Sequence, residues 1–167
     1  YANVCTTNLR MGKYEKAFAN FRRAEAIYLQ HYDENHIRLG FVYQGLGSVF
    51  HQYKTDYKKA LEYFNKALRI FDQNNHSSAV TTLQDIGYMY RELKEYEMAI
   101  DIFDSTLTLD PEPFTYIKSL QILADIYSET KDFENANKYY KKAILEIGKL
   151  ENKETRLSGT IYMTYGN

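Results

Sequence analysis

The chain has 167 residues, of which 44% are hydrophobic and 26% are charged, and its net charge is −1. These values are typical of a folded protein with a core, and they provide no overall field that would attract nucleic acid or an anionic membrane. A single cysteine, Cys5, excludes an internal disulfide. No run approaches the ~18 apolar residues of a membrane span, so we expect no membrane insertion.

The first half of the chain predicts four amphipathic helices, because apolar and small residues recur at i, i+3, i+4 and i+7. The first covers residues 1–11, and the second runs from Tyr14 to about His31 after a turn at residues 12–13. A polar break at residues 32–35 follows, in which Asp33 or Asn35 can cap the third helix. A turn at residues 54–56 leads to the fourth helix.

The second half repeats this spacing. Residues 83–90 and 96–103 predict two helices around a polar break at residues 92–95, with small residues where two backbones come close. Asp110 can cap the next helix, with Pro111 at its first position, where the missing N–H costs nothing. Another helix follows from Phe133, and residues 156–167 start a ninth. No useful β-alternation occurs, so the sequence predicts an all-α protein.

An internal repeat is the strongest signal in the sequence. The turn residues GKY, TDY, KEY and KDF each precede a small residue, and an aromatic residue follows four positions later. The small residues are Ala17, Ala60, Ala99 and Ala136, and the aromatic residues are Phe21, Phe64, Phe103 and Tyr140. A further small residue lies twelve positions before the alanine, except in the second copy, where Gly47 lies thirteen before it. The second turn therefore holds one extra residue.

This pattern resembles the tetratricopeptide repeat (TPR) family, whose Leu-Gly, Tyr, Ala, Phe and terminal Pro positions it follows. Successive alanines lie 43, 39 and 37 residues apart, which exceeds the family repeat of ~34. The resemblance implies a right-handed α-solenoid of antiparallel helix pairs, a TPR-like superhelix. We expect one domain over 1–167, with repeats at about 1–35, 36–75, 76–110 and 111–152 and a partial repeat at 153–167. We also expect the chain to be a piece of a longer protein.

The first helix of each pair has a face that is not used for packing within the pair, and in a stacked solenoid these faces line the concave side. The resemblance thus predicts a non-catalytic scaffold that binds a peptide or protein partner in a groove. The predicted groove residues are Thr6, Arg10, Phe41, Gln44, Ser48, His51, Thr81, Gln84, Tyr88, Arg91, Lys118, Gln121 and Asp125. Leu9, Gln52, Glu92, Ser128 and Glu129 accompany them.

Two features of this set predict how it would bind. Gln44, Gln84 and Gln121 occupy equivalent places in successive repeats, so their amides could hydrogen-bond the backbone of an extended peptide. Glutamine is also common at exposed helix positions for its helix propensity alone. Tyr88 is expected to face the groove, where tyrosine often anchors partners.

Catalytic and cofactor motifs are missing from the sequence. His31, His36, His51 and His76 have no metal-ligand spacing, and no phosphate-binding or nucleophile motif occurs. Cys5 takes a small-residue place between helices, which favours a structural role. We therefore predict no enzymatic activity, no cofactor and no metal.

Two other functions stay open at this point. The chain could be a sensor or self-association module of a larger signalling or transcription-regulatory protein. It could also be a nucleic-acid-binding helical repeat, since residues 1–70 carry 11 Lys/Arg and only 6 Asp/Glu. The basic pairs at 22–23, 58–59 and 141–142 form no continuous stripe with stacking aromatics in the sequence, which disfavours nucleic acid. We expect a cytoplasmic location.

Overall fold

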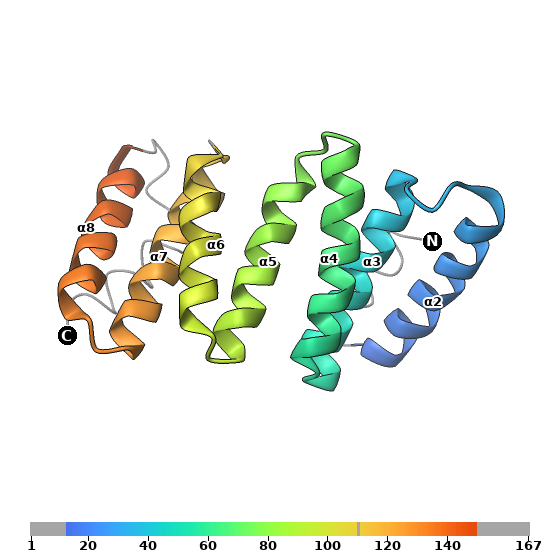
Figure 1. The fold of residues 1–167 in the computed structure, drawn as a ribbon, viewed down its shortest axis with the longest axis horizontal. Helices are drawn as coiled ribbons and strands as arrows, with labels where there is room; N and C mark the ends of the chain where they lie inside the picture. The colour runs from blue at the N-terminus through green and yellow to red at the C-terminus, as the bar shows by residue number, and fades with distance from the viewer. Residues whose placement is uncertain (1–12, 110, 150–167) are drawn as a thin grey trace. The chain divides into compact units, whose positions relative to one another are not determined.

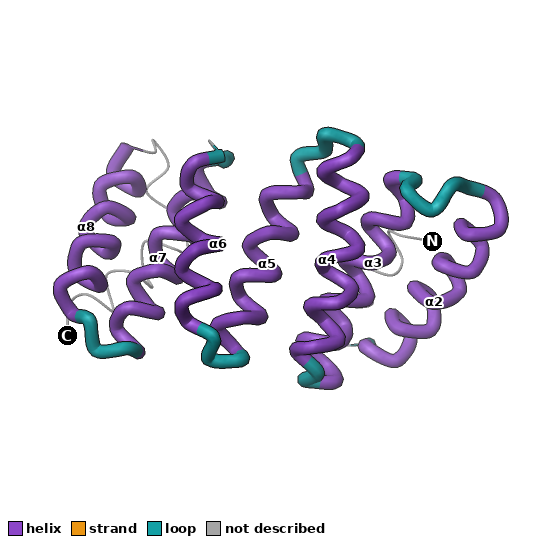
Figure 2. The backbone as a smooth tube through the Cα atoms, viewed as in Figure 1, coloured by secondary structure: helices purple, strands orange, loops and turns teal. Residues whose placement is uncertain are grey.

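The computed structural model describes residues 13–109 and 111–149, and every regular element within those residues is helical (Figure 1, Figure 2). The prediction of an all-α protein is thereby confirmed. The chain forms two compact units, one up to Glu95 and one from Tyr96. In the sequence, this boundary falls at the break between the two helices of the predicted third repeat.

From residue 13 onward, where the structure describes it, the first unit contains five helical segments. They are α2 (Tyr14–His31), α3 (Ile37–Val49), η1 (Phe50–Lys54), α4 (Tyr57–Gln73) and α5 (Ser78–Glu92). Helix α3 packs against both α2 and α4, and α4 packs against α5. Their shared core includes Phe21, Leu39, Leu46, Ile70 and Phe71, each at most 1% exposed. The unit is thus held together by α3, which has a neighbouring helix on two sides.

Glycine lets α3 come close to both of these neighbours. A Cβ atom on Gly45 would collide with the ring of Phe21 on α2, and a Cβ on Gly47 would lie 2.7 Å from the ring of Phe64 on α4. Both phenylalanine side chains are at most 2% exposed, so the rings fill the space above the glycine backbone. Gly47, a small residue of the repeat pattern, is therefore a point of close approach between α3 and α4.

The extra residue of the second repeat lies in η1, a short π-helical segment that follows α3 directly. The N–H of Asp56 donates to the carbonyl of Phe50, six residues earlier, whereas Glu95 and Asp132 donate to carbonyls five residues earlier. A π-type turn accommodates one additional residue without breaking the helix. The insertion that the sequence predicts in the turn is therefore absorbed at the end of the helix.

The second unit contains α6 (Tyr96–Thr108), α7 (Pro113–Glu129) and α8 (Phe133–Lys149), and α7 packs against both α6 and α8. Ile117 and Leu120 of α7 meet Ala143 and Ile147 of α8 in one apolar cluster. A second cluster joins Ala124 of α7 to Ala136 and Tyr140 of α8. As in the first unit, the contact positions are those of the sequence repeat.

The four alanines of the repeat are all buried: Ala17, Ala60 and Ala99 are 0% exposed and Ala136 is 4% exposed. Their aromatic partners Phe21, Phe64, Phe103 and Tyr140 are at most 7% exposed. The prediction that these residues mark packed helix faces is confirmed.

Two predicted helix starts are wrong. The side chain of His36, and not that of Asp33 or Asn35, caps α3 by accepting a hydrogen bond from the N–H of Arg38 (3.2 Å). Asp33 instead accepts from the N–H of Asn35 and closes a local turn. Helix α7 begins at Pro113 and not at Pro111, although the rule that placed proline at the first position still holds.

Several predictions lie outside the described residues. They are the helix at 1–11 with Cys5, Thr6 and Arg10, the cap at Asp110, and the partial repeat at 153–167.

Candidate functional site

A mainly polar face of the first unit is formed by α3, η1 and α5. Phe41, Gln44 and Ser48 recur at i, i+3 and i+7 on α3, away from the glycines that face α2 and α4. Phe41 is 38% exposed although its ring packs edge-on against Phe71 of α4 at 5.0 Å. We define the α3–α5 surface by seven predicted groove residues: Phe41, Gln44, Ser48, His51, Thr81, Tyr88 and Arg91.

Hydrogen bonds connect the two helices beneath this surface. The side-chain amide of Gln44 donates to the Thr82 hydroxyl at 3.2 Å and to the Asp85 carboxylate at 3.5 Å. The Ser48 hydroxyl donates to the carbonyl of Gln44 in its own helix. Gln44 therefore joins α3 to α5, whereas the Ser48 hydroxyl is bonded within α3.

At one end of the surface lies a compact group of polar aromatic and charged residues, the His51 cluster. The ring of His51 lies 5.4 Å from that of Tyr88 and 6.1 Å from that of Tyr57, measured between centroids. The Arg91 guanidinium lies 5.9 Å from the Tyr88 ring. The Glu92 carboxylate lies near both Tyr57 and Tyr88 and raises the pKa of each phenol. Residues from η1, α4 and α5 thus meet at one place.

The environment of the cluster changes its protonation. Burial lowers the pKa of His51, and the nearby Glu92 carboxylate opposes part of that decrease. Burial also raises the pKa of Tyr88, and the adjacent Glu92 carboxylate raises it further. At neutral pH the cluster therefore offers a neutral imidazole and neutral phenols beside one cation and one anion.

The predicted column of exposed glutamine amides is not found. Gln84 is only 5% exposed, and the amide of Gln44 is already bonded to α5. Gln121 in the second unit is half-buried. Sequence spacing placed these three residues at equivalent positions, but the neighbouring helix decides whether an amide stays accessible. Thr81 is exposed as expected, and its hydroxyl donates to the carbonyl of Ser78.

The second unit holds the other three predicted groove residues that the structure describes. Lys118 is exposed on α7, and Gln121 lies one turn further along. The Asp125 carboxylate accepts a hydrogen bond from the Tyr140 hydroxyl of α8. Asp125 therefore contributes to α7–α8 packing, and its role in partner binding stays a prediction, as does that of Lys118 and Gln121.

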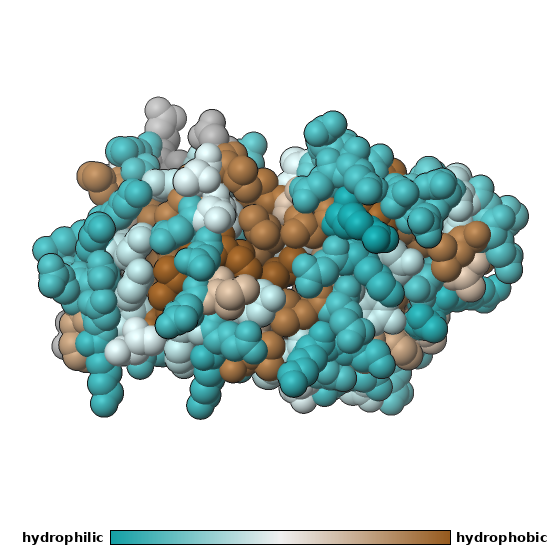
Figure 3. Space-filling view, in the orientation of Figure 1, coloured by the Kyte–Doolittle hydropathy of each residue, from teal (hydrophilic) through white to brown (hydrophobic). Residues whose placement is uncertain are grey.

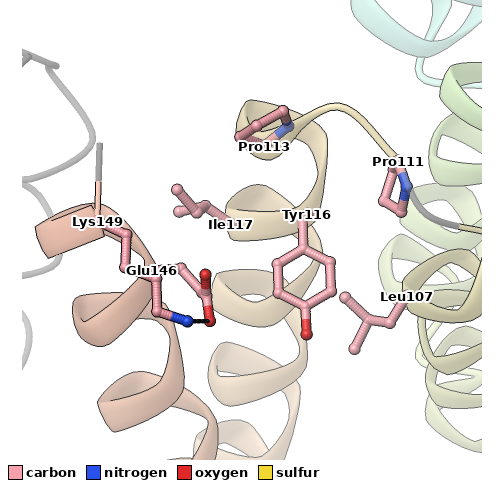
Figure 4. Close-up of a pocket in the computed structure, with 7 residues that line it drawn as sticks. All are labelled: Leu107, Pro111, Pro113, Tyr116, Ile117, Glu146 and Lys149. Atoms are coloured by element: carbon pink, nitrogen blue, oxygen red, sulfur yellow. Dashed lines mark hydrogen bonds and ion pairs between the residues drawn. The ribbon is translucent and has the colours of Figure 1, made fainter. Parts of the chain in front are cut away.

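A pocket that sequence reasoning missed opens beside the start of α7 (Figure 4). Its volume is about 540 Å³. It is lined by Leu107, Pro111, Pro113, Tyr116, Ile117, Glu146 and Lys149. Figure 4 shows Glu146 and Lys149 paired at its edge, with Nζ 2.9 Å from Oε1. Pro111 and Pro113 lie at the start of α7, and the lining residues identify no ligand.

In residues 13–109 and 111–149, no group of three or more His, Cys, Asp or Glu side chains could hold a metal ion. No helix of the described part of the chain is long and apolar enough to cross a membrane.

Comparison with known proteins identifies the repeat. Tetratricopeptide repeat models match residues 1–73, 56–112 and 117–146. No curated protein matches the chain.

Solved structures share the fold. BtubC (BKLC) from P. vanneervenii has a TM-score of 0.74 at 19% identity, over 97% of this chain and 70% of that one. Nearly identical TPR-like repeats from a kinesin light chain candidate of Podosopora anserina have a TM-score of 0.76 at 14% identity, over 99% of this chain and 85% of that one. The MamA protein has a TM-score of 0.67 at 19% identity, over 92% of this chain and 74% of that one.

Sequence identities of 14–19% support a shared fold and give no information about function. The family models cover most of the sequence, and the buried alanines and aromatic residues occupy the positions that the repeat requires. The chain therefore belongs to the tetratricopeptide repeat family, and its fold class is that of the TPR-like α-solenoids.

Proposed function

We propose that the chain is a non-catalytic interaction scaffold that binds a peptide or protein partner on the α3–α5 surface. The observation that carries this proposal is the His51 cluster, in which Tyr88 and Arg91 lie together at one end of a polar surface. Tyrosine and arginine are the residue types most often found at binding hot spots. The family match supports the role of scaffold, and the cluster supports the location.

The packing around the surface explains how it could bind without large rearrangement. Helix α3 is fixed between α2 and α4 by glycine–phenylalanine contacts, and Gln44 joins it to α5. A surface that is ordered before binding loses less conformational entropy when a partner arrives. Phe41 at one end and Tyr88 at the other offer apolar area, while Thr81 and Arg91 offer polar groups.

Selection from a random peptide display library tests this function. We expect peptides selected on the wild-type chain to lose at least about tenfold in affinity for a Tyr88→Ala, Arg91→Ala double variant, since two hot-spot side chains are removed. A matched control, Tyr116→Ala with Lys149→Ala, changes the same residue classes in the second unit and should leave the affinity unchanged. Failure to select any peptide, or equal binding by both variants, would contradict the proposal.

The cellular setting is a further part of the proposal. We propose that the chain acts in the cytoplasm within a signalling protein. A single cysteine and a helical repeat fold are compatible with that setting. Fractionation of cells that express the parent protein tests the location. Recovery of the protein in a secreted or periplasmic fraction would contradict it.

A further inference from the structure

A second surface of the first unit, separate from the α3–α5 surface, combines aromatic rings with unpaired lysines. Four rings follow one another where α2, α3, η1 and α4 meet. The centroids of Phe18 and Phe50 lie 5.8 Å apart, those of Phe50 and Tyr63 lie 5.4 Å apart, and those of Tyr63 and Tyr43 lie 6.2 Å apart. The aromatic residues thus form a continuous row.

A lysine lies over each of three rings in this row. The Nζ atom of Lys54 is 5.4 Å from the Phe18 centroid, that of Lys59 is 5.3 Å from Phe50, and that of Lys66 is 5.4 Å from Tyr63. These distances fit cation–π contacts. The four rings and the three lysines together make the lysine–aromatic stripe.

The three lysines are exposed and have no anionic partner. Among the described residues, no carboxylate forms an ion pair with Lys54, Lys59 or Lys66. Glu25 faces the stripe from α2, but it is paired with Arg22. Figure 3 shows that the visible face over α4 is mainly hydrophilic. Among the residues that the structure describes, the three lysines therefore form no ion pair, although the carboxylates of Glu25 and Glu62 lie near the Tyr63 ring.

The second unit keeps the ring stack of the repeat and one of its lysines, since Lys142 stands where the second repeat has Lys66. Tyr127 and Tyr139 occupy the places of Phe50 and Tyr63 and are stacked at 5.5 Å. There, however, the Tyr139 hydroxyl donates to the Asp104 carboxylate at 3.0 Å, and Asn135 stands where the second repeat has Lys59. The aromatic pair is thus common to both repeats, whereas the positive charge at the place of Lys59 is found in the second repeat and not in the fourth.

From this charge pattern we propose that the lysine–aromatic stripe binds an extended acidic segment of a protein partner. An extended segment can follow the row of rings, whose successive centroids lie 5.4–6.2 Å apart. Each carboxylate meets one ammonium group that the ring beneath holds in place.

A single-stranded nucleic acid fits the stripe less well. Such ligands bind by stacking bases on open aromatic faces. Phe50 is 6% exposed and Tyr43 is 9% exposed, and lysines cover the faces that remain. The stripe offers charge without stacking platforms, which favours a carboxylate-bearing peptide.

Fluorescence anisotropy with a labelled peptide of alternating Glu and Ser tests the proposal. A peptide in which Gln replaces every Glu is the control ligand. We expect the triple variant Lys54→Gln, Lys59→Gln, Lys66→Gln to bind the acidic peptide about tenfold or more weakly, since three exposed ion pairs are lost. Lys59→Gln alone should bind the acidic peptide about two- to fivefold more weakly. This single variant tests the proposal even if the triple variant fails to fold. Wild-type affinity should fall steeply with salt.

The matched control variant is Lys138→Gln, Lys141→Gln, Lys142→Gln on α8, which changes the net charge equally and also removes lysines that lie over rings. It should bind as the wild type does. The Tyr88→Ala, Arg91→Ala variant should also bind normally, so failure of the stripe and failure of the α3–α5 surface give different results. Equal loss in the α8 variant, equal binding of the Gln peptide, tighter binding of single-stranded oligouridylate, or occupation of the stripe by a second copy of the chain would overturn the proposal.

Discussion

His51 shows how a single residue couples the candidate site to stability. Its imidazole lies between Tyr57 and Tyr88, and burial holds its pKa below the ordinary value. A histidine whose pKa is lower in the folded state binds fewer protons when folded than when unfolded. Its contribution to stability is therefore fully present above the unfolded pKa of about 6.5 and is lost as pH falls below that value.

We therefore predict that the free energy of unfolding of the wild type falls between pH 7.5 and pH 5.5, and that His51→Gln reduces this fall. Urea denaturation at the two pH values measures both. Glu92→Gln should steepen the fall, because the carboxylate that partly favours the charged imidazole is gone. A pH dependence that is identical in wild type and His51→Gln would contradict the account of this cluster.

A second prediction concerns the turns that precede α4, α6 and α8. Thr55, Lys94 and Lys131 have φ angles of 48°, 61° and 65°, in the left-handed region that favours glycine. The sequence has glycine, Gly12, at the corresponding place of its first repeat. We expect Lys131→Gly to raise the free energy of unfolding by about 0.5–1 kcal/mol, because the strain of a side chain in this region is removed.

Thermal or urea denaturation measures this change. Lys141→Gly, inside α8, is the control and should cost about 1 kcal/mol, since glycine is unfavourable within a helix. Destabilisation by Lys131→Gly as well would show that its backbone conformation is not strained.

At this scale the sequence predicts apolar residues better than polar ones. The burial of Ala60 and Phe64 follows from spacing alone, because the helix period places both on one face. The loss of the Gln44 amide to hydrogen bonds within the protein could not be predicted in this way, because its acceptors Thr82 and Asp85 lie on another helix. The stacked rings beneath Lys59 and Lys66 were likewise missed, because the aromatic residues come from three different segments.

At the scale of the helix, glycine has opposite effects in α3 and α8. A Cβ on Gly47 would lie 2.7 Å from the buried Phe64 ring, whereas a Cβ on Gly148 would meet nothing within 4 Å. We expect Gly47→Ala to lower the free energy of unfolding by about 1–3 kcal/mol through overpacking. Gly148→Ala should raise it by up to about 1 kcal/mol through helix propensity.

Chemical denaturation of the two variants compares them under the same conditions. A neutral effect of Gly47→Ala would mean that α3 and α4 can separate without cost, which would contradict the close approach seen between them.

The helices themselves follow from the sequence more closely than their ends do. The breaks at 32–35, 54–56 and 92–95 agree with the ends of α2, η1 and α5. The start of α7 was misplaced because Pro111 and Pro113 both satisfy the rule for a first position. The π-helical form of η1 could not be predicted either, because an extra residue can lengthen a loop or widen a helical turn.

At the scale of the whole chain, the repeat pattern determines the fold, and the surface side chains of each repeat determine what that repeat could bind. The first unit carries both candidate surfaces, the α3–α5 surface with its neutral His51 cluster and the lysine–aromatic stripe. The second unit has the same stacked aromatic pair with an aspartate in hydrogen-bond contact. Repeats with one architecture therefore carry different surface chemistry.

Hydrogen–deuterium exchange of the chain, free and saturated with a peptide selected on it, tests the proposed function most directly. Binding slows exchange where the partner covers or rigidifies the backbone. We predict increased protection in α3, η1 and α5, centred on residues 41–51 and 81–91, with no change in α8. Protection confined to the second unit, or no protected segment at all, would contradict the assignment of the partner site to the α3–α5 surface.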